Sequence, residues 1–254
     1  MDNFIPVESL PLAVGFPGEL HDPSEFVTPK QVMVRNKLQE ICGDSRGDDA
    51  IIALWYYSCS LKYPMTKSGI PTDYHRLEAF EHTLDYLPGL GIRVRPQVVL
   101  ETGKDGADYW QPPHMTIRLQ GGDCEDRSSV LVSLLRNFIL PDEVFVAVGA
   151  FNSHMEMNHA WGVLGKPGRG FIMETTAPGP EGWVREEALR ERYRPLLYYN
   201  DRMMLIHPSL EGIGDPVFLT RILCPVSANE GEKIANIRQL WGEISNGRAP
   251  ARLL

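Results

Sequence analysis

The segment GGDCEDRSSVLVSLLR (residues 121–136) places the start of a helix at a defined point in the chain. Gly121 and Gly122 permit a tight turn, and Asp123 is a favoured helix N-cap residue. The apolar residues that follow recur at helical spacing. Other helical patterns occupy residues 28–43, 48–63, 74–87 and 231–244. After residue 136, the runs DEVFVAVGAF, NHAWGVL, GFIMET, LLYYN and RMMLIHP are typical of strands. Helices followed by a run of strands predict an α+β domain.

The same patterns predict how the chain is divided. Residues 1–45 form a proline- and glycine-rich arm and a first helix, for which we expect Thr28 as the N-cap and Gly43 just past the end. Residues 46–200 form the core, in which the stretch from 89 to 119 is expected to be irregular. Residues 201–254 form a C-terminal extension packed on that core.

Composition excludes several classes of function. The formal net charge of −8 argues against binding to nucleic acids or anionic membranes, which requires basic patches. The most apolar runs are too short to cross a bilayer, and the N-terminus does not resemble a secretory signal.

Neither a phosphate-binding glycine loop nor a dinucleotide fingerprint is present, so we expect no cofactor. The four cysteines are scattered without a CxxC pair, which favours neither a zinc site nor a disulfide framework and predicts a reducing cytoplasm.

Cys124 is the most informative of these cysteines because it occupies the first turn of the predicted helix. The unpaired N–H groups and the dipole of a helix N-terminus stabilise a thiolate, whereas the neighbouring Glu125 and Asp126 oppose its formation. A nearby imidazolium would be needed to favour the thiolate. Alternatively, Cys124 continues the apolar stripe of Leu131 and Leu135 and is merely buried.

The strands that follow supply an imidazole and a carboxylate. Alternation in NHAWGVL puts His159 on one face of its strand, and Glu174 lies across a glycine-rich hairpin loop. Pairing of Val163 with Gly170 would place His159 opposite Glu174. Pairing of Leu164 with Phe171 would make the two diagonal neighbours on the same face. A carboxylate beside an imidazole fixes its tautomer, which is the arrangement that a cysteine nucleophile requires.

The stretches GGDCEDRSSVLVSLLR, HAW and FIMETT together resemble the transglutaminase-like superfamily of papain-like cysteine enzymes, over roughly residues 50–200. YWQPPHMTIRLQGGDCED further resembles the bacterial transglutaminase-like cysteine proteinases. The resemblance implies a papain-like core in which the nucleophile helix packs on an antiparallel sheet. It also implies that Cys124 is the nucleophile, His159 the general base and then acid, and Glu174 the orienting acid, at a position where the family usually has aspartate.

The resemblance also implies an oxyanion donor upstream of the nucleophile, for which Trp110 and Gln111 are candidates beside the backbone N–H of Cys124. The expected substrate is a protein, peptide or other amide. Hydrolysis is the default, because water is always present and no acyl-acceptor site is identifiable, and transglutaminase-type cross-linking is the alternative within the enzyme class. The oligomeric state is not encoded in any pattern of the sequence.

Two other readings stay open at this point. The chain could be a non-catalytic transglutaminase-like binding module. A zinc site could instead use Cys124, His159 and Glu174, with His154 or Asp123 as a fourth ligand. We expect no resident metal, because no tight ligand pair such as CxxC or HxxxH is present.

Overall fold

The structure is a computed structural model. It describes residues 4–8, 13–15, 19–62, 110–152, 159–176 and 184–208. The helices predicted at residues 74–87 and 231–244 lie outside the described residues.

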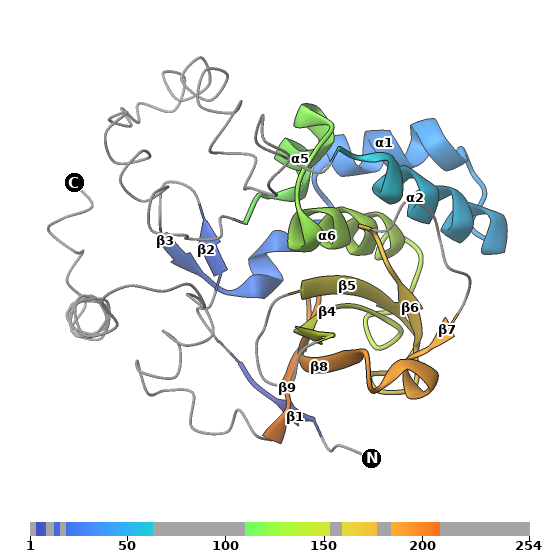
Figure 1. Cartoon of the computed structure of the whole chain (residues 1–254). Helices are drawn as coiled ribbons and strands as arrows, with labels where there is room; N and C mark the ends of the chain where they lie inside the picture. The colour runs from blue at the N-terminus through green and yellow to red at the C-terminus, as the bar shows by residue number, and fades with distance from the viewer. Residues whose placement is uncertain are drawn as a thin grey trace, which may run out of the picture.

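The described part of the chain is built around a seven-stranded antiparallel sheet in the order β1-β9-β8-β4-β5-β6-β7 (Figure 1). Its strands are β1 (Ile5–Pro6), β4 (Val144–Phe151), β5 (His159–Leu164), β6 (Phe171–Met173), β7 (Val184–Arg185), β8 (Tyr193–Tyr199) and β9 (Met204–Ile206). A separate hairpin pairs β2 (Ala13–Gly15) with β3 (Glu19–His21). The central strand β4 is buried along almost its whole length, as expected for a run of apolar residues covered on both faces.

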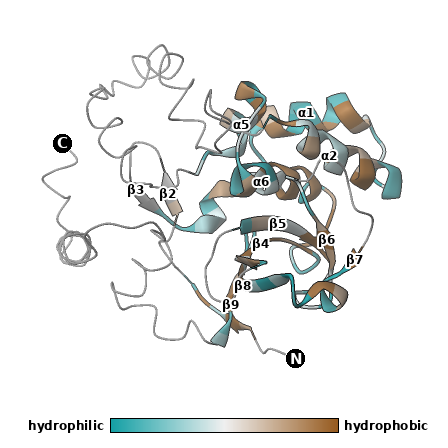
Figure 2. Ribbon diagram, in the orientation of Figure 1, coloured by the Kyte–Doolittle hydropathy of each residue, from teal (hydrophilic) through white to brown (hydrophobic). Residues whose placement is uncertain are grey.

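Helices cover one face of the sheet. They are α1 (Val32–Cys42), α2 (Asp48–Ser60), α5 (Pro113–Leu119) and α6 (Cys124–Leu135), and short 3₁₀ helices span Pro23–Phe26 and Glu186–Leu189. Helix α6 lies between the sheet and the other three helices, and it packs on β4 and β5 (Figure 1). Brown and teal segments alternate along α1 and α2, as expected for helices with one buried face (Figure 2). In α6, by contrast, every residue from Glu125 to Leu135 is buried.

Two apolar clusters line the two faces of the sheet. The larger one contains side chains of α6 together with Val146, Val148 and Leu197. The smaller one lies on the opposite face and contains Phe145, Ala147, Trp161, Val163, Ile172, Tyr193 and Tyr198. No helix among the described residues is long and apolar enough to cross a membrane.

The prediction of an α+β domain with the Cys124 helix packed on an antiparallel sheet is confirmed. The strands predicted after this helix are present, and Gly43 ends α1 with a positive φ of 53°. The prediction of Thr28 as the N-cap is wrong, because α1 begins at Val32 and the Gln31 side chain accepts from the N–H groups of its first turn. The end of the stretch predicted to be irregular also contains a helix, α5, with Pro113 at its first position.

Candidate active site

The candidate active site begins at the N-terminus of α6, where Cys124 is the first helical residue and Asp123 the N-cap. The turn before it needs glycine, because a Cβ atom on Gly122 would lie 2.6 Å from Cβ of Asp126. The Cys124 thiol is partly buried, and its Sγ lies 3.3 Å from Oε2 of Glu125. Cys124 therefore faces a carboxylate of its own helix turn, as the acidic residues around it predicted.

His159 and Glu174 form a direct pair on neighbouring strands. Nε2 of His159 lies 2.8 Å from Oε2 of Glu174, and both side chains are largely buried. Leu164 pairs with Phe171 and Gly162 with Met173, so the second of the two predicted registers is the one adopted. Glu174 directly follows β6, and its side chain reaches His159 diagonally.

Four donors surround the Glu174 carboxylate. The backbone N–H and the hydroxyl of Thr176 donate to Oε1 at 2.8 and 2.7 Å, and the Tyr193 hydroxyl donates to Oε2 at 3.0 Å, beside His159. Burial alone would raise the pKa of Glu174, but the hydrogen bonds and charge of His159 and the hydrogen bonds of Thr176 outweigh it and lower this pKa to about 2. Glu174 is therefore an ionised, fully oriented partner for the imidazole.

The backbone of Glu174 is fixed from the opposite side by α2. The indole N–H of Trp55 donates to the Glu174 carbonyl oxygen at 2.7 Å, and Sγ of Cys59 lies 3.4 Å from the same oxygen. Trp55 is 2% exposed, so this hydrogen bond is formed away from water. The carboxylate and the backbone carbonyl of Glu174 are thus both held by residues from other elements of the fold.

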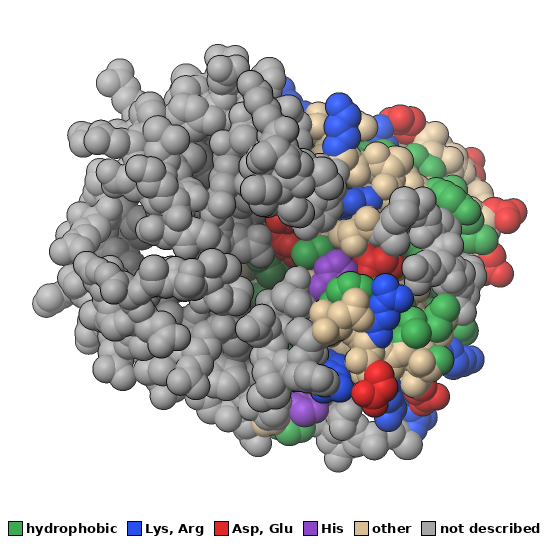
Figure 3. All heavy atoms as spheres, in the orientation of Figure 1, with side chains coloured by type: hydrophobic (Ala, Val, Ile, Leu, Met, Phe, Trp, Pro, Cys, Tyr) green, Lys and Arg blue, Asp and Glu red, His purple; other side chains and the backbone are tan. Residues whose placement is uncertain are grey.

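Aromatic rings enclose the His159 imidazole. Its centroid lies 5.0 Å from that of Phe151, and it stacks on Trp161 at 6.0 Å with an interplanar angle of 28°. These ring contacts restrict rotation of the imidazole and shield its contact with Glu174 from water. On the face seen in Figure 3, hydrophobic, acidic and histidine side chains of the described residues lie next to one another near the centre.

Helix α6 lies directly against the segment that carries Glu174. Ser128, one turn after Cys124, lies 3.2 Å from Thr175 through their hydroxyl oxygens. Further along the helix, Leu131 packs so closely on β5 that a Cβ on Gly162 would lie 3.0 Å from its Cδ2. The structure therefore joins His159 to Glu174 by a hydrogen bond and packs the Cys124 helix against both of their strand segments.

The two upstream oxyanion candidates lie beside the start of α6. Gln111 is fully buried, and its backbone N–H donates to Oδ1 of Asp126 at 2.6 Å while its side-chain amide donates to Oδ2. Trp110 is 7% exposed and packs between Phe26 and Tyr199, with centroid distances of 5.6 Å to each ring. Assignment of either residue as an oxyanion donor stays a prediction.

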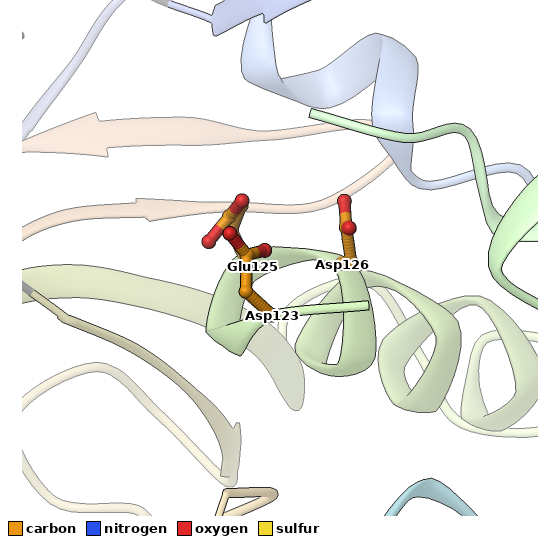
Figure 4. Close-up of side chains that lie close together, drawn as sticks. All are labelled: Asp123, Glu125 and Asp126. Carbon is orange, nitrogen blue, oxygen red and sulfur yellow. The ribbon is translucent and has the colours of Figure 1, made fainter. Parts of the chain in front are cut away.

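Three carboxylates converge at the start of α6. Asp123, Glu125 and Asp126 are all buried, and one ligand atom from each lies within 4.8 Å of the others (Figure 4). Among the described residues this is the only such group of three or more His, Cys, Asp or Glu side chains. The alternative zinc set of Cys124, His159 and Glu174 is thus not assembled, and His154 lies outside the described residues.

The three-carboxylate cluster was not predicted from the sequence, where Glu125 and Asp126 were considered as charges that oppose formation of a Cys124 thiolate. Their burial comes from packing around α6, in which every residue from Glu125 to Leu135 is buried, and no local sequence pattern reports it. Oxygen ligands in this number suit a hard divalent cation such as calcium, with water or backbone carbonyls completing the coordination shell.

No family model matches the sequence, and no curated protein matches it. Among solved structures, LapG of Legionella pneumophila aligns over 73% of this chain and 96% of its own, with 20% sequence identity and a TM-score of 0.34. Its EGTA-treated form aligns over 81% and 96%, and its calcium-bound form over 79% and 97%, both at 18% identity and a TM-score of 0.34.

Proposed function

We propose that this protein is a cysteine-dependent acyl-transfer enzyme that cleaves or transfers an amide or isopeptide bond through a thioester, acting as a peptidase or amidase on protein or peptide substrates. The observation that carries the proposal is the buried 2.8 Å contact between His159 and Glu174, next to a helix that begins at Cys124. Cysteine catalysis requires a nucleophile, a base and a group that orients the base.

The orientation of the imidazole suits this chemistry. Because Nε2 is engaged by the Glu174 carboxylate, the neutral ring carries its proton on Nε2, and Nδ1 is the basic nitrogen. In the proposed reaction, Nδ1 takes the thiol proton of Cys124. The helix N-terminus and the His159 imidazolium formed in this step stabilise the resulting thiolate against the opposing charge of Glu125, whose Oε2 lies 3.3 Å from Sγ.

The reaction then proceeds in two halves. Sγ of Cys124 attacks the amide carbonyl carbon, and the C–S bond forms as the carbonyl electron pair moves to oxygen. Collapse of this intermediate breaks the C–N bond, and Nδ1 of His159 gives its proton to the leaving amine. Water, deprotonated by the same nitrogen, next attacks the thioester, and the carboxylic acid leaves as the thiol is restored. An amine in place of water gives transfer instead of hydrolysis.

The reactivity of the Cys124 thiol can be tested within one protein, because Cys42 and Cys59 serve as internal reference thiols. Burial raises the pKa of Cys59 to about 11, despite the lowering effect of Arg127, and burial also raises the pKa of Cys42. Iodoacetamide labelling at pH 7, followed by mass spectrometry, compares the three thiols in one sample. We expect Cys124 to react at least about tenfold faster than Cys42.

Two histidine variants complete the test. His159→Ala is expected to remove the excess reactivity of Cys124, whereas His207→Ala, which changes a histidine packed against Phe4, leaves it intact. A Cys124 thiol that reacts no faster than Cys42, or that keeps its rate in His159→Ala, contradicts the proposed enzyme and favours a non-catalytic module.

A second proposal concerns the three-carboxylate cluster, which we infer binds a divalent cation of the calcium type. The specific observation is the burial of three acidic side chains within 4.8 Å of one another in a chain of net charge −8. Buried like charges repel strongly, and a bound cation would neutralise them. Asp123, Glu125 and Asp126 would hold the ion, which would brace the turn that presents Cys124.

A further inference from the structure

The regular alternation of side chains between the two faces of the sheet is interrupted near the middle of strand β8. Leu197 pairs with Val148 and Pro195 with Gly149, so Leu196 has no partner on β4, which is a one-residue β-bulge. Leu196 and Leu197 both pack toward the α6 side of the sheet. Strict alternation from Leu197 would turn Tyr193 to that side as well, because the two residues are four positions apart. Tyr193 instead belongs to the cluster on the opposite face.

On that face Tyr193 meets the candidate catalytic pair. Its hydroxyl donates to Oε2 of Glu174 at 3.0 Å, the same oxygen that His159 contacts at 2.8 Å. Its ring lies 6.4 Å from that of His159 and 5.1 Å from that of Trp161, measured between centroids. The bulge therefore puts Tyr193 on the face of the sheet where its hydroxyl reaches Glu174.

The backbone at the bulge depends on one glycine of β4. A Cβ atom on Gly149 would lie 2.0 Å from the carbonyl oxygen of Arg194, a distance that no side chain permits. Gly149 also pairs with His159 on its other side, so this residue lies between the bulge and the imidazole. Close approach of the two backbones next to Tyr193 is thus possible only with glycine at this position.

We propose that the β8 bulge directs Tyr193 onto Glu174, and that Tyr193 is a positioning residue that holds this carboxylate against His159. The proposal deepens the proposed function and rests on it. Glutamate has one more rotatable bond than aspartate, so a glutamate at this position needs a second point of attachment. Thr176 holds Oε1 and Tyr193 holds Oε2, which leaves His159 with one ring orientation.

The test compares Tyr193→Phe with Tyr198→Phe. Both tyrosines are buried on β8, and both donate to a buried carboxylate, since the Tyr198 hydroxyl lies 2.5 Å from Oε1 of Glu186. Each variant loses a hydroxyl–carboxylate hydrogen bond and keeps the ring, and Tyr198→Phe also loses the hydrogen bond that the Gly168 N–H donates to its hydroxyl at 3.0 Å. Of the two tyrosines, only Tyr193 contacts Glu174. The first readout is the rate of Cys124 labelling by iodoacetamide, and the second is the tautomer of the His159 ring from ¹H–¹⁵N NMR.

We expect Tyr193→Phe to slow Cys124 labelling about tenfold, in line with the loss of one hydrogen bond to a charged group, and to give His159 a mixture of tautomers. Tyr198→Phe should leave both readouts at the wild-type value. Equal behaviour of the two variants in both readouts overturns the proposal. If His159→Ala shows that wild-type Cys124 is not activated, the proposed function fails, and the His159 tautomer in Tyr193→Phe alone decides the role of Tyr193.

Discussion

Glu174 carries a negative charge in a buried position, and its neighbours explain why this charge is stable there. An isolated buried carboxylate is strongly disfavoured, whereas one that accepts several hydrogen bonds is not. Here Thr176, Tyr193 and His159 together supply four donors to its two oxygens. Since each donor comes from a fixed point in the fold, the carboxylate also fixes the imidazole.

At this position the length of the side chain should matter as much as its charge. Glu174→Asp keeps the charge but withdraws the carboxylate by one methylene, while Trp55 still holds the backbone carbonyl. The shorter side chain cannot contact Thr176, Tyr193 and His159 together. We expect Cys124 labelling to slow by roughly tenfold. Wild-type labelling in Glu174→Asp would show that the glutamate is not required.

The lowered pKa of Glu174 predicts a specific acid dependence of stability. Its folded pKa is about 2, against an ordinary value of 4.5, so the carboxylate stabilises the fold above pH 4.5 and loses this effect as the pH falls toward 2. The full contribution is roughly 3 kcal/mol by the linkage relation. Chemical denaturation should show the free energies of unfolding of wild type and Glu174→Gln converging between about pH 5 and pH 2.

The matched control for this measurement is Glu187→Gln, which changes an exposed glutamate. Its difference from wild type should stay small over the same pH range. A gap between wild type and Glu174→Gln that does not change with pH would contradict the linkage, because the stabilisation would then not depend on the charge.

At the scale of elements, the sequence predicted the parts of the site that follow a regular period. The α6 start follows from Gly-Gly-Asp, and the β5–β6 hairpin follows from alternation around a glycine-rich loop. The choice between two registers could not be made in advance, because each keeps His159 and Glu174 on one face. The face of the sheet on which Tyr193 lies could not be predicted. A bulge moves every side chain on one side of it to the opposite face, and no local pattern marks Leu196 as the extra residue.

The role of the bulge can be tested by substituting Gly149. Gly149→Ala introduces a Cβ atom into the Arg194 carbonyl oxygen, so the strands must separate or shift register. We expect a loss of about 1–3 kcal/mol in the free energy of unfolding, measured by urea denaturation, together with slower Cys124 labelling.

Gly47→Ala is the matched control, because a Cβ atom there meets nothing within 4 Å. Gly47 is the N-cap of α2, so the alanine should cost up to about 1 kcal/mol of stability, but Cys124 labelling should stay at the wild-type rate. Wild-type labelling in a folded Gly149→Ala protein would show that the bulge does not align the pair.

At the scale of the molecule, the site forms where three layers pack together: the sheet, helix α6, and the outer helices α1, α2 and α5. Helix α2 supplies Trp55 from 119 positions before Glu174 in the chain, and β8 supplies Tyr193 from 19 positions after it. Long-range convergence of this kind leaves no spacing rule in the sequence. For the same reason the three-carboxylate cluster was not predicted, since its burial depends on the packing of α1, α2 and α5 around α6.

The cluster predicts that a divalent cation stabilises the whole fold. A ligand that binds only the folded state, present at 100 times its dissociation constant, raises the free energy of unfolding by about 2.7 kcal/mol. This corresponds to a rise of roughly 5–10 °C in the melting temperature of a chain this long.

Thermal unfolding after EDTA treatment, with and without added calcium, measures this shift. Glu125→Gln should abolish it, whereas Asp49→Asn, which changes a first-turn acid of α2, should preserve it. If calcium has no effect on wild type, or shifts Glu125→Gln equally, the three carboxylates do not bind the ion, and the turn before Cys124 is held by hydrogen bonds such as those from Gln111 to Asp126.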